Sequence, residues 1–184
     1  MDFIEVNSEI GQLEAVILHT PGSEIEQMTP GNIHKALYSD LLNLNIAKKE
    51  YSYFETVLSK WAKTYQVMDL LTQVLSQSTA KSELLNKVLS TENMQFLFPD
   101  LIELPADRLA KYLIEGYPYI KGVHPKEFEE ERFMLKPLYN LFFTRDASSS
   151  VYDNVLIHSM STKVRDRESY IMESIFKHLF GAGT

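Results

Sequence analysis

The hydrophobic pattern of the first seventy residues is typical of a strand, a helix and a second strand. A half-alternating stretch runs into the apolar AVIL segment and stops at Pro21-Gly22, which predicts a buried strand at about Leu13 to His19. The segment YQVMDL predicts a second strand at Tyr65 to Leu70. Between them, apolar residues recur every three to five positions from Ile46 to Ala62 and form one helical face: Ile46, Ala47, Tyr51, Phe54, Val57, Leu58 and Trp61. We expect this helix to cover the first sheet.

The middle third of the chain has a different pattern. Helical spacing with little β-branched alternation runs through LLTQVL, KSELLNKVLS, MQFLFPDLIEL and PADRLAKYLIEG. Ser78 or Thr79 can cap one helix, Pro105 suits a first helical turn, and Gly116 suits the position after a helix end. We therefore expect residues 71–133 to form a small helical bundle inserted between strands.

A strand pattern returns in LYNLFFT and again in NVLIHSM, and a final helix is predicted at about Asp166 to Leu179. As a strand, LYNLFFT would have two faces, Leu141 and Phe143 on one and Asn140, Phe142 and Thr144 on the other. Asp146 would follow the end of this strand and enter a small polar loop. Its carboxylate would then reach the space above the edge of the sheet.

Composition places the chain among single soluble domains, with room for one inserted subdomain. It has 184 residues, of which 45% are hydrophobic and 23% charged. The net charge of -7 and the absence of a Lys/Arg stripe argue against nucleic acid as a partner. The amino terminus lacks a basic segment followed by a long apolar run, and no window resembles a membrane helix. We expect a cytoplasmic protein with no membrane partner.

The sequence contains no cysteine, so this chain has no disulfide, thiolate metal site or cysteine nucleophile. Its five histidines show no HxxxH or HxH spacing, which gives metal binding little support. No Gly-rich phosphate loop and no GxSxG motif is present. From these residues alone, Asp146 next to Arg145 is most simply an ion pair or a turn cap, and KVRDRES a charged helix start.

Three stretches nevertheless carry a family resemblance. SEIGQLEAVILHTPGSEIEQMTPGN resembles the opening of arginine deiminases, and ADRLAKYLIEG resembles part of their inserted helical bundle. KPLYNLFFTRDASS resembles their strand motif, in which an Asp follows an Asn after a short interval. The pattern continues in HSMSTKVRDRES, where Arg165 and Glu168 follow Met160 at the family's separations. The resemblance runs in order along essentially the whole chain.

The resemblance implies hydrolysis of L-arginine to L-citrulline and ammonia through a cysteine thiolate, with no cofactor and no metal. By the same resemblance, Asp146 clamps the substrate guanidinium, while Asn140 and Arg165 hold the α-carboxylate. These roles are chemically sound. A carboxylate matches the paired N–H donors of a guanidinium, and an amide and a guanidinium are suitable donors to a carboxylate.

The implied fold is an α/β propeller of ββαβ units (the pentein fold) with an inserted helical bundle. This chain would form only part of it: residues 1–70 as the first part of a propeller unit, 71–133 as the helical insert, and 134–184 as the return to the propeller. The family's nucleophilic Cys, its catalytic Glu and His and a second Asp come from later sequence, so we expect no catalytic residue and no activity in this portion alone. Two departures, at Ser39-Asp40 and Glu50-Tyr51-Ser52, affect the expected fine specificity.

Two kinds of function remain open. The chain is either the amino-terminal portion of an arginine deiminase-like hydrolase or a complete, non-catalytic relic that binds arginine or a partner. Within the enzyme class, a related guanidine-modifying hydrolase or amidinotransferase is the alternative, although Asn140 together with Arg165 favours arginine over agmatine. If part of the propeller is missing, exposed apolar faces, including the Phe142/Phe143 strand, should make the chain self-associate as a homo-oligomer.

Overall fold

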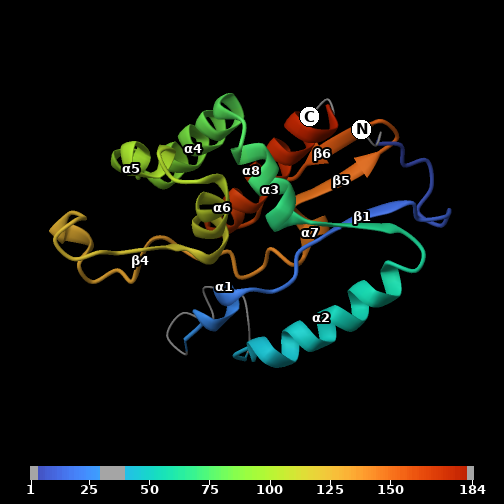
Figure 1. Ribbon diagram of the computed structural model, residues 1–184, viewed down its shortest axis with the longest axis horizontal. Helices are drawn as coiled ribbons and strands as arrows, with labels where there is room; N and C mark the ends of the chain where they lie inside the picture. The colour runs from blue at the N-terminus through green and yellow to red at the C-terminus, as the bar shows by residue number, and fades with distance from the viewer. Residues whose placement is uncertain (1–3, 30–39, 182–184) are drawn as a thin grey trace.

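A computed structural model describes residues 4–29 and 40–181 of the protein and has mixed α/β architecture, as expected (Figure 1). In these residues the strands form three separate two-stranded sheets, β1–β2, β3–β4 and β5–β6. Helices α3, α4, α5, α6 and α8 gather into one cluster, while α2 lies apart from them along the lower side of Figure 1. The division into units 1–70, 71–133 and 134–184 stays a prediction.

The first strand, β1 (Ala15–Leu18), forms where the AVIL pattern predicts it. It pairs in parallel with β2 (Lys63–Gln66), from Ala15 opposite Lys63 to Leu18 opposite Gln66. The second predicted strand is largely wrong, because the chain turns helical at Val67 and α3 (Val67–Leu75) begins there. The reason is visible in the spacing of the apolar residues, which bury one helical stripe: Val67, Leu70, Leu71, Val74 and Leu75.

Between these strands lie the short helix α1 (Ser23–Glu26) and the long helix α2 (Leu44–Leu58). Asn43 caps α2, since its side-chain oxygen accepts a hydrogen bond from the backbone N–H of Ile46 at 3.1 Å. The helix is thus confirmed, although it ends before Ala62. None of its residues is buried, so it does not cover the sheet in the manner of a core helix.

The main core lies between the clustered helices. These are α3, α4 (Ser78–Glu92), the 3-10 turn η1 (Gln95–Leu97), α5 (Phe98–Ile102), α6 (Ala106–Glu115) and α8 (Asp166–Ile175). Their inward faces are almost entirely Leu, Ile, Val and Ala, with Leu85, Leu109 and Leu113 fully inaccessible. Burial of such side chains stabilises the fold by roughly 1.5–3 kcal/mol each.

Of the two expected helix ends, the start of α4 differs from the prediction and the end of α6 agrees with it. Gln77 rather than Ser78 or Thr79 precedes α4, and its side chain makes no capping bond, so the capping prediction is wrong. Gly116 follows α6 as predicted, with φ 98. A Cβ at Gly116 would come within 2.9 Å of the Phe133 ring and 3.1 Å of the Leu135 carbonyl oxygen, so both space and backbone angle require glycine.

The region after α6 is not helical throughout. A short antiparallel pair, β3 (Tyr117–Pro118) and β4 (Phe133–Leu135), flanks the 3-10 turn η2 (Lys126–Phe128). In Figure 1 this excursion extends away from the helix cluster on the left. The last part of the 71–133 interval therefore differs from the helical bundle predicted for it.

The predicted strand LYNLFFT does not form. Residues 139–142 make turns instead, and the chain enters α7 (Thr144–Ala147) before the hairpin of β5 (Ser148–Val151) and β6 (Asn154–Ile157). Successive backbone bonds join Phe143 N–H to the Asn140 carbonyl and Asp146 N–H to the Phe143 carbonyl. Leu141 is buried whereas Phe143 is 47% exposed, so the two do not share a face. Alternation alone does not make a strand without a neighbouring strand to bond.

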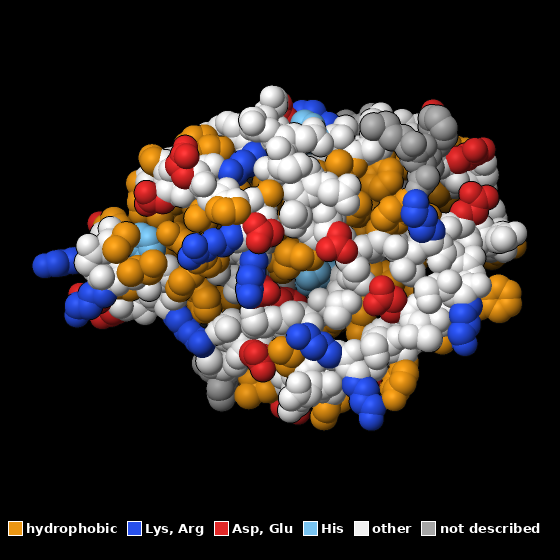
Figure 2. Space-filling model, in the orientation of Figure 1, with side chains coloured by type: hydrophobic (Ala, Val, Ile, Leu, Met, Phe, Trp, Pro, Cys, Tyr) orange, Lys and Arg blue, Asp and Glu red, His pale blue; other side chains and the backbone are white. Residues whose placement is uncertain are grey.

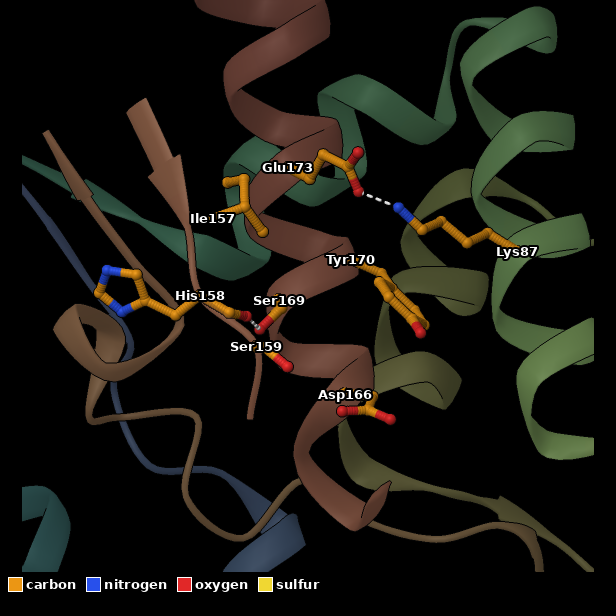
Figure 3. Close-up of a pocket in the computed structure, with 8 residues that line it drawn as sticks. All are labelled: Lys87, Ile157, His158, Ser159, Asp166, Ser169, Tyr170 and Glu173. Atoms are coloured by element: carbon orange, nitrogen blue, oxygen red, sulfur yellow. Dashed lines mark hydrogen bonds and ion pairs between the residues drawn. The ribbon is translucent and has the colours of Figure 1, made fainter. Parts of the chain in front are cut away.

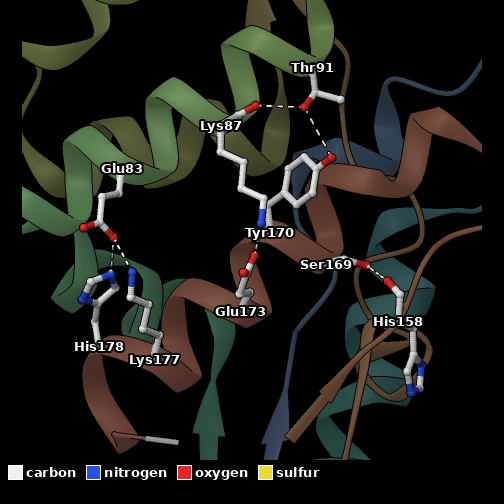
Figure 4. Close-up of polar contacts among 9 residues, drawn as sticks. All are labelled: Glu83, Lys87, Thr91, His158, Ser169, Tyr170, Glu173, Lys177 and His178. Atoms are coloured by element: carbon white, nitrogen blue, oxygen red, sulfur yellow. Dashed lines mark hydrogen bonds and ion pairs between the residues drawn. The ribbon is translucent and has the colours of Figure 1, made fainter. Parts of the chain in front are cut away.

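The final helix is confirmed. It comprises the 3-10 turn η3 (Lys163–Arg165), α8 and a π-helical turn, η4 (Phe176–Phe180). Polar contacts fasten this helix to α4 (Figure 4). Glu83 accepts from Lys177 at 2.7 Å, Lys87 pairs with Glu173, and Thr91 contacts the Tyr170 hydroxyl. These contacts join the outer edges of the same two helices whose apolar faces meet in the core.

Candidate functional site

Asp146 lies in the last turn of α7, with its side chain about half exposed. Thr144, at the start of the same short helix, donates from its hydroxyl to the Ile17 carbonyl of β1 at 3.0 Å and so ties α7 to the first sheet. The neighbouring Arg145 turns outward and pairs with Glu9 at 2.7 Å. Arg145 is therefore occupied by another carboxylate, and Asp146 faces a different guanidinium.

That guanidinium belongs to Arg165, which ends η3 and immediately precedes α8. Its Nη1 lies 3.0 Å from Asp146 Oδ2. Its other edge is held by Glu168, with Nε 3.1 Å from both carboxylate oxygens and Nη2 2.7 Å from Oε2. Arg165 is mostly buried, so a rigid, planar donor group sits between two carboxylates.

Glu168 is almost completely buried, and this burial raises its pKa above the usual 4.5. The bonds from Arg165 oppose the rise, the nearby Asp146 carboxylate adds to it, and His19 opposes it. The resemblance named Glu168 as part of the HSMSTKVRDRES pattern but gave it no role. In the structure it holds the inner edge of the Arg165 guanidinium.

A second buried polar pair lies at the carboxyl end of β1. His19 Nε2 is 3.1 Å from Glu24 Oε1, and that oxygen also accepts from the Gly22 N–H at 2.6 Å. The sequence pattern placed His19 at a strand end but had no signal for its partner. A Cβ at Gly22 would stand 2.6 Å from Glu24 Oε2, so a larger residue here would require the Glu24 carboxylate to shift.

These groups border an open hollow at the carboxyl ends of the two parallel strands. Its lining combines residues of the loop after β1 and of α1, α2, β2 and α3: His19, Thr20, Pro21, Gly22, Glu24, Lys48, Glu55, Gln66, Met68 and Asp69. Gln66 bridges it, accepting from Thr20 N–H at 2.9 Å and donating to Glu55 at 2.9 Å. Among residues 4–29 and 40–181, no group of three or more His, Asp or Glu side chains is arranged to hold a metal ion.

The third predicted site residue, Asn140, is buried in the turn that leads into α7, and its carbonyl accepts from Phe143 N–H at 2.9 Å. Of the two arginines in KVRDRES, only Arg165 faces Asp146. Arg167 points into the helix cluster, where it pairs with Glu92 at 2.7 Å. The helix start is therefore more than a solvated charged segment, because Arg165 pairs with Asp146 and Glu168 whereas Arg167 pairs with Glu92 inside the helix cluster.

Asp146 and Arg165 are thus brought together as each other's partner. The Asp146 carboxylate receives a guanidinium, and the Arg165 guanidinium receives carboxylates, which are the two kinds of contact that opposite ends of a free arginine molecule would make. Three methylene groups separate those ends of arginine. The two residues therefore cannot bind both ends of one molecule while they remain in direct contact.

Comparison with known proteins shows the family of the chain. The sequence profile described as arginine deiminase matches residues 34–182. The chain is 32% identical over 190 residues to the arginine deiminase of Oenococcus oeni and 32% identical over 189 residues to that of Limosilactobacillus reuteri. It is 31% identical over 189 residues to the arginine deiminase of Borrelia garinii.

This chain belongs to the arginine deiminase family. Each of these three alignments covers 95% of the chain and 46% of the relative, so the chain spans about half the length of the curated relatives it matches. Asn140, Asp146 and Arg165 all lie within the part matched by the arginine deiminase profile. The sequence departs from the arginine deiminase pattern at two places. The first is Ser39-Asp40, and its Ser39 lies outside the described residues.

The Glu50-Tyr51-Ser52 departure from the arginine deiminase pattern falls on α2, and there the structure gives Tyr51 a specific contact. Its hydroxyl oxygen accepts from the His19 N–H at 3.1 Å. Burial raises the pKa of Tyr51, and the bond from the His19 backbone opposes that rise. Tyr51 therefore stays a neutral phenol at physiological pH and links α2 to the carboxyl end of β1.

The sequence predicts no membrane-spanning helix. In residues 4–29 and 40–181, no helix combines the length and the apolar character needed to cross a bilayer.

Proposed function

We propose that this chain is the amino-terminal portion of an arginine deiminase-like hydrolase, which converts L-arginine and water to L-citrulline and ammonia. Membership of the arginine deiminase family supports this class of reaction. The observation that supports the placement of the site is the Asp146 carboxylate, which meets the guanidinium of Arg165 at 3.0 Å in a half-exposed position. A substrate guanidinium has the same planar set of N–H donors.

In this proposal Asp146 binds the guanidinium of the substrate, and Asn140 and Arg165 bind its α-carboxylate. Substrate entry must then separate Arg165 from Asp146. Glu168 stays on the inner edge of Arg165 and leaves the Nη1 side for the incoming carboxylate. Each lost contact is replaced by an equivalent charged one, so the exchange leaves no buried charge unpaired.

The proposed site is incomplete within these residues. Hydrolysis of a guanidinium by this family's route needs a thiolate that attacks the guanidinium carbon, expels ammonia and is released by water. The 184 residues contain no cysteine. We therefore expect no citrulline from this chain alone, and we place it in a pentein-type α/β propeller whose further units supply the nucleophile and the acid/base groups.

A substrate comparison tests these assignments in the complete protein. Agmatine has the guanidinium of arginine but no carboxylate. Arg165→Met should raise the KM for L-arginine by at least about tenfold while changing agmatine turnover little, because the lost contact serves the carboxylate. The control is Arg145→Met, which removes an exposed guanidinium paired with Glu9. Equal losses for both substrates would contradict the role of Arg165, and failure of the parent protein to form citrulline would contradict the reaction.

A second candidate is a non-catalytic protein that binds L-arginine or a protein partner. The exposed apolar residues of α2 favour it, because they offer an apolar surface to a protein partner. Calorimetric titration of the complete protein with L-arginine separates the two: binding with no citrulline formed supports the binding protein. Transfer of an amidino group to an added amine would instead indicate a related guanidine-modifying enzyme.

A further inference from the structure

His158 follows β6 and touches three segments around Asp146. Its ring Nδ1 lies 2.9 Å from the Asp146 carbonyl oxygen, and its Nε2 lies 2.9 Å from Ser149 Oγ. Its backbone N–H donates to the Ala147 carbonyl at 3.0 Å, and its own carbonyl accepts from Ser169 Oγ of α8 at 2.8 Å. In Figure 3 the ring points away from the polar hollow beside Tyr170 and Asp166, while the carbonyl faces Ser169.

These contacts determine the tautomer of the ring. A carbonyl oxygen can only accept, so Nδ1 must carry the hydrogen that bonds Asp146. In the neutral ring Nε2 is then bare and accepts from the Ser149 hydroxyl. If the ring is protonated, the hydroxyl can rotate and accept instead, and the bond to Asp146 is kept. The contact with Asp146 therefore does not depend on the charge of His158.

The position of Asp146 needs such support. Helix α7 has only four residues, too few for a helix to be stable by itself, and its last carbonyls have no partners within it. His158 satisfies two of them, the carbonyls of Asp146 and Ala147. Thr144 anchors the other end of α7 to Ile17 of β1. A shift of the α7 backbone at Asp146 would break the His158 bond and displace the Cα from which the carboxylate reaches Arg165.

We propose that His158 is a positioning residue, which holds the Asp146 backbone so that the carboxylate meets a guanidinium. The identity of that guanidinium as the substrate's rests on the proposed function. The position of Asp146 relative to Arg165 does not, and it can be measured in this chain without any enzymatic assay.

The first test is the tautomer of His158, read from the ring nitrogen shifts in ¹⁵N NMR of the 184-residue chain. We expect the Nδ1–H form in the neutral ring, whereas a solvated histidine prefers Nε2–H. An Nε2–H tautomer at His158 would overturn the proposal, because that ring cannot donate to Asp146.

The second test compares two amide substitutions of different reach. In His158→Asn the amide nitrogen occupies roughly the place of Nδ1, and in His158→Gln it occupies roughly that of Nε2. The Asn variant should keep the parent signals of the Arg165 Nε–H and the Asp146 carboxyl carbon, and the Gln variant should shift both. Unfolding midpoints measured alongside identify any shift that comes from a general loss of stability. Equal signals in the two variants at equal midpoints would overturn the proposal.

Kinetics of the complete protein extend the comparison. His158→Gln should lower kcat for L-arginine by about tenfold or more, as misplacement of a binding group does, and His158→Asn should stay within a few-fold of the parent. Equal kcat values for the two variants would contradict the positioning role. If the parent forms no citrulline, the proposed function fails, while the NMR signals still decide the role of His158.

Discussion

Helices α2 and α4 have the same length, 15 residues, but opposite surroundings. Five residues of α4 are buried against the helix cluster, whereas α2 buries none. Instead, α2 and the turn after it expose large apolar side chains: Ile46, Tyr53, Phe54, Val57 and Trp61. Orange groups lie along the lower side of Figure 2, the side where Figure 1 shows α2. An apolar helical face thus predicts a helix but does not say what covers it. In the described residues, the core is built by α3 to α6 and α8.

Replacing a core residue should have the largest effect on stability. Leu113 of α6 is completely buried, so Leu113→Ala should lower the free energy of unfolding by about 2–5 kcal/mol through lost burial and a residual cavity. Urea denaturation measures this. Lys111→Ala on the exposed side of the same helix is the control and should change stability by no more than about 0.5 kcal/mol. Similar losses for both would show that α6 is not the core helix described.

The buried cation of the cluster should come next. Arg167 donates to both oxygens of Glu92 and to the carbonyls of Leu113 and Lys136. Arg167→Met keeps the apolar stem but leaves these acceptors unpaired, so we expect a loss of roughly 2–3 kcal/mol in urea denaturation. A neutral or stabilising effect would mean that water or a neighbour replaces the guanidinium.

The contribution of the site region to stability should depend on pH. Burial raises the pKa of Glu168 above 4.5, so its contribution to stability is fully present below that value and is lost as pH rises through the folded-state pKa. Glu168→Gln removes this dependence. The stability of the parent relative to the variant should therefore fall as pH rises from about 4 and level off above the folded pKa. A difference that is constant with pH, or that grows in favour of the parent, would contradict the raised pKa.

The exposed helix should respond least in stability. Val57→Gln combined with Trp61→Gln should change the free energy of unfolding by no more than about 0.5 kcal/mol per site, because neither side chain is buried. The same pair should weaken self-association in sedimentation experiments, whereas Lys60→Gln should not. A parent chain that stays monomeric at high concentration would make the expected homo-oligomer wrong for this segment.

Local pattern was a good guide to where strands and helices form. The strand around Val16 and the helices at α2 and α8 follow from the spacing of apolar residues, whether the helix is buried, as α8 is, or exposed, as α2 is. LYNLFFT misled, because alternation cannot show that no strand lies beside it, and the turn at Asn140 is stabilised by local backbone bonds instead. The YQVMDL segment misled because its apolar residues fit strand and helix alike.

The site shows the same limit. Its residues Asp146 and Arg165 came from a resemblance, but their direct contact depends on how α7 and α8 pack and could not be deduced from spacing. The pairs His19–Glu24 and His158–Asp146 carry no sequence signal for the same reason.

The most direct test of the account is the turnover of L-arginine by the complete protein carrying Asp146→Asn. This change keeps the shape of the side chain but removes the charge that meets a guanidinium, and Asp153→Asn in the exposed β5–β6 turn is the matched control. We expect kcat for citrulline formation to fall on the order of 100-fold in Asp146→Asn, because the reacting carbon is no longer held in place, and to stay near the parent value in the control. A kcat for Asp146→Asn within a few-fold of the parent would contradict the assignment of Asp146 to the substrate guanidinium.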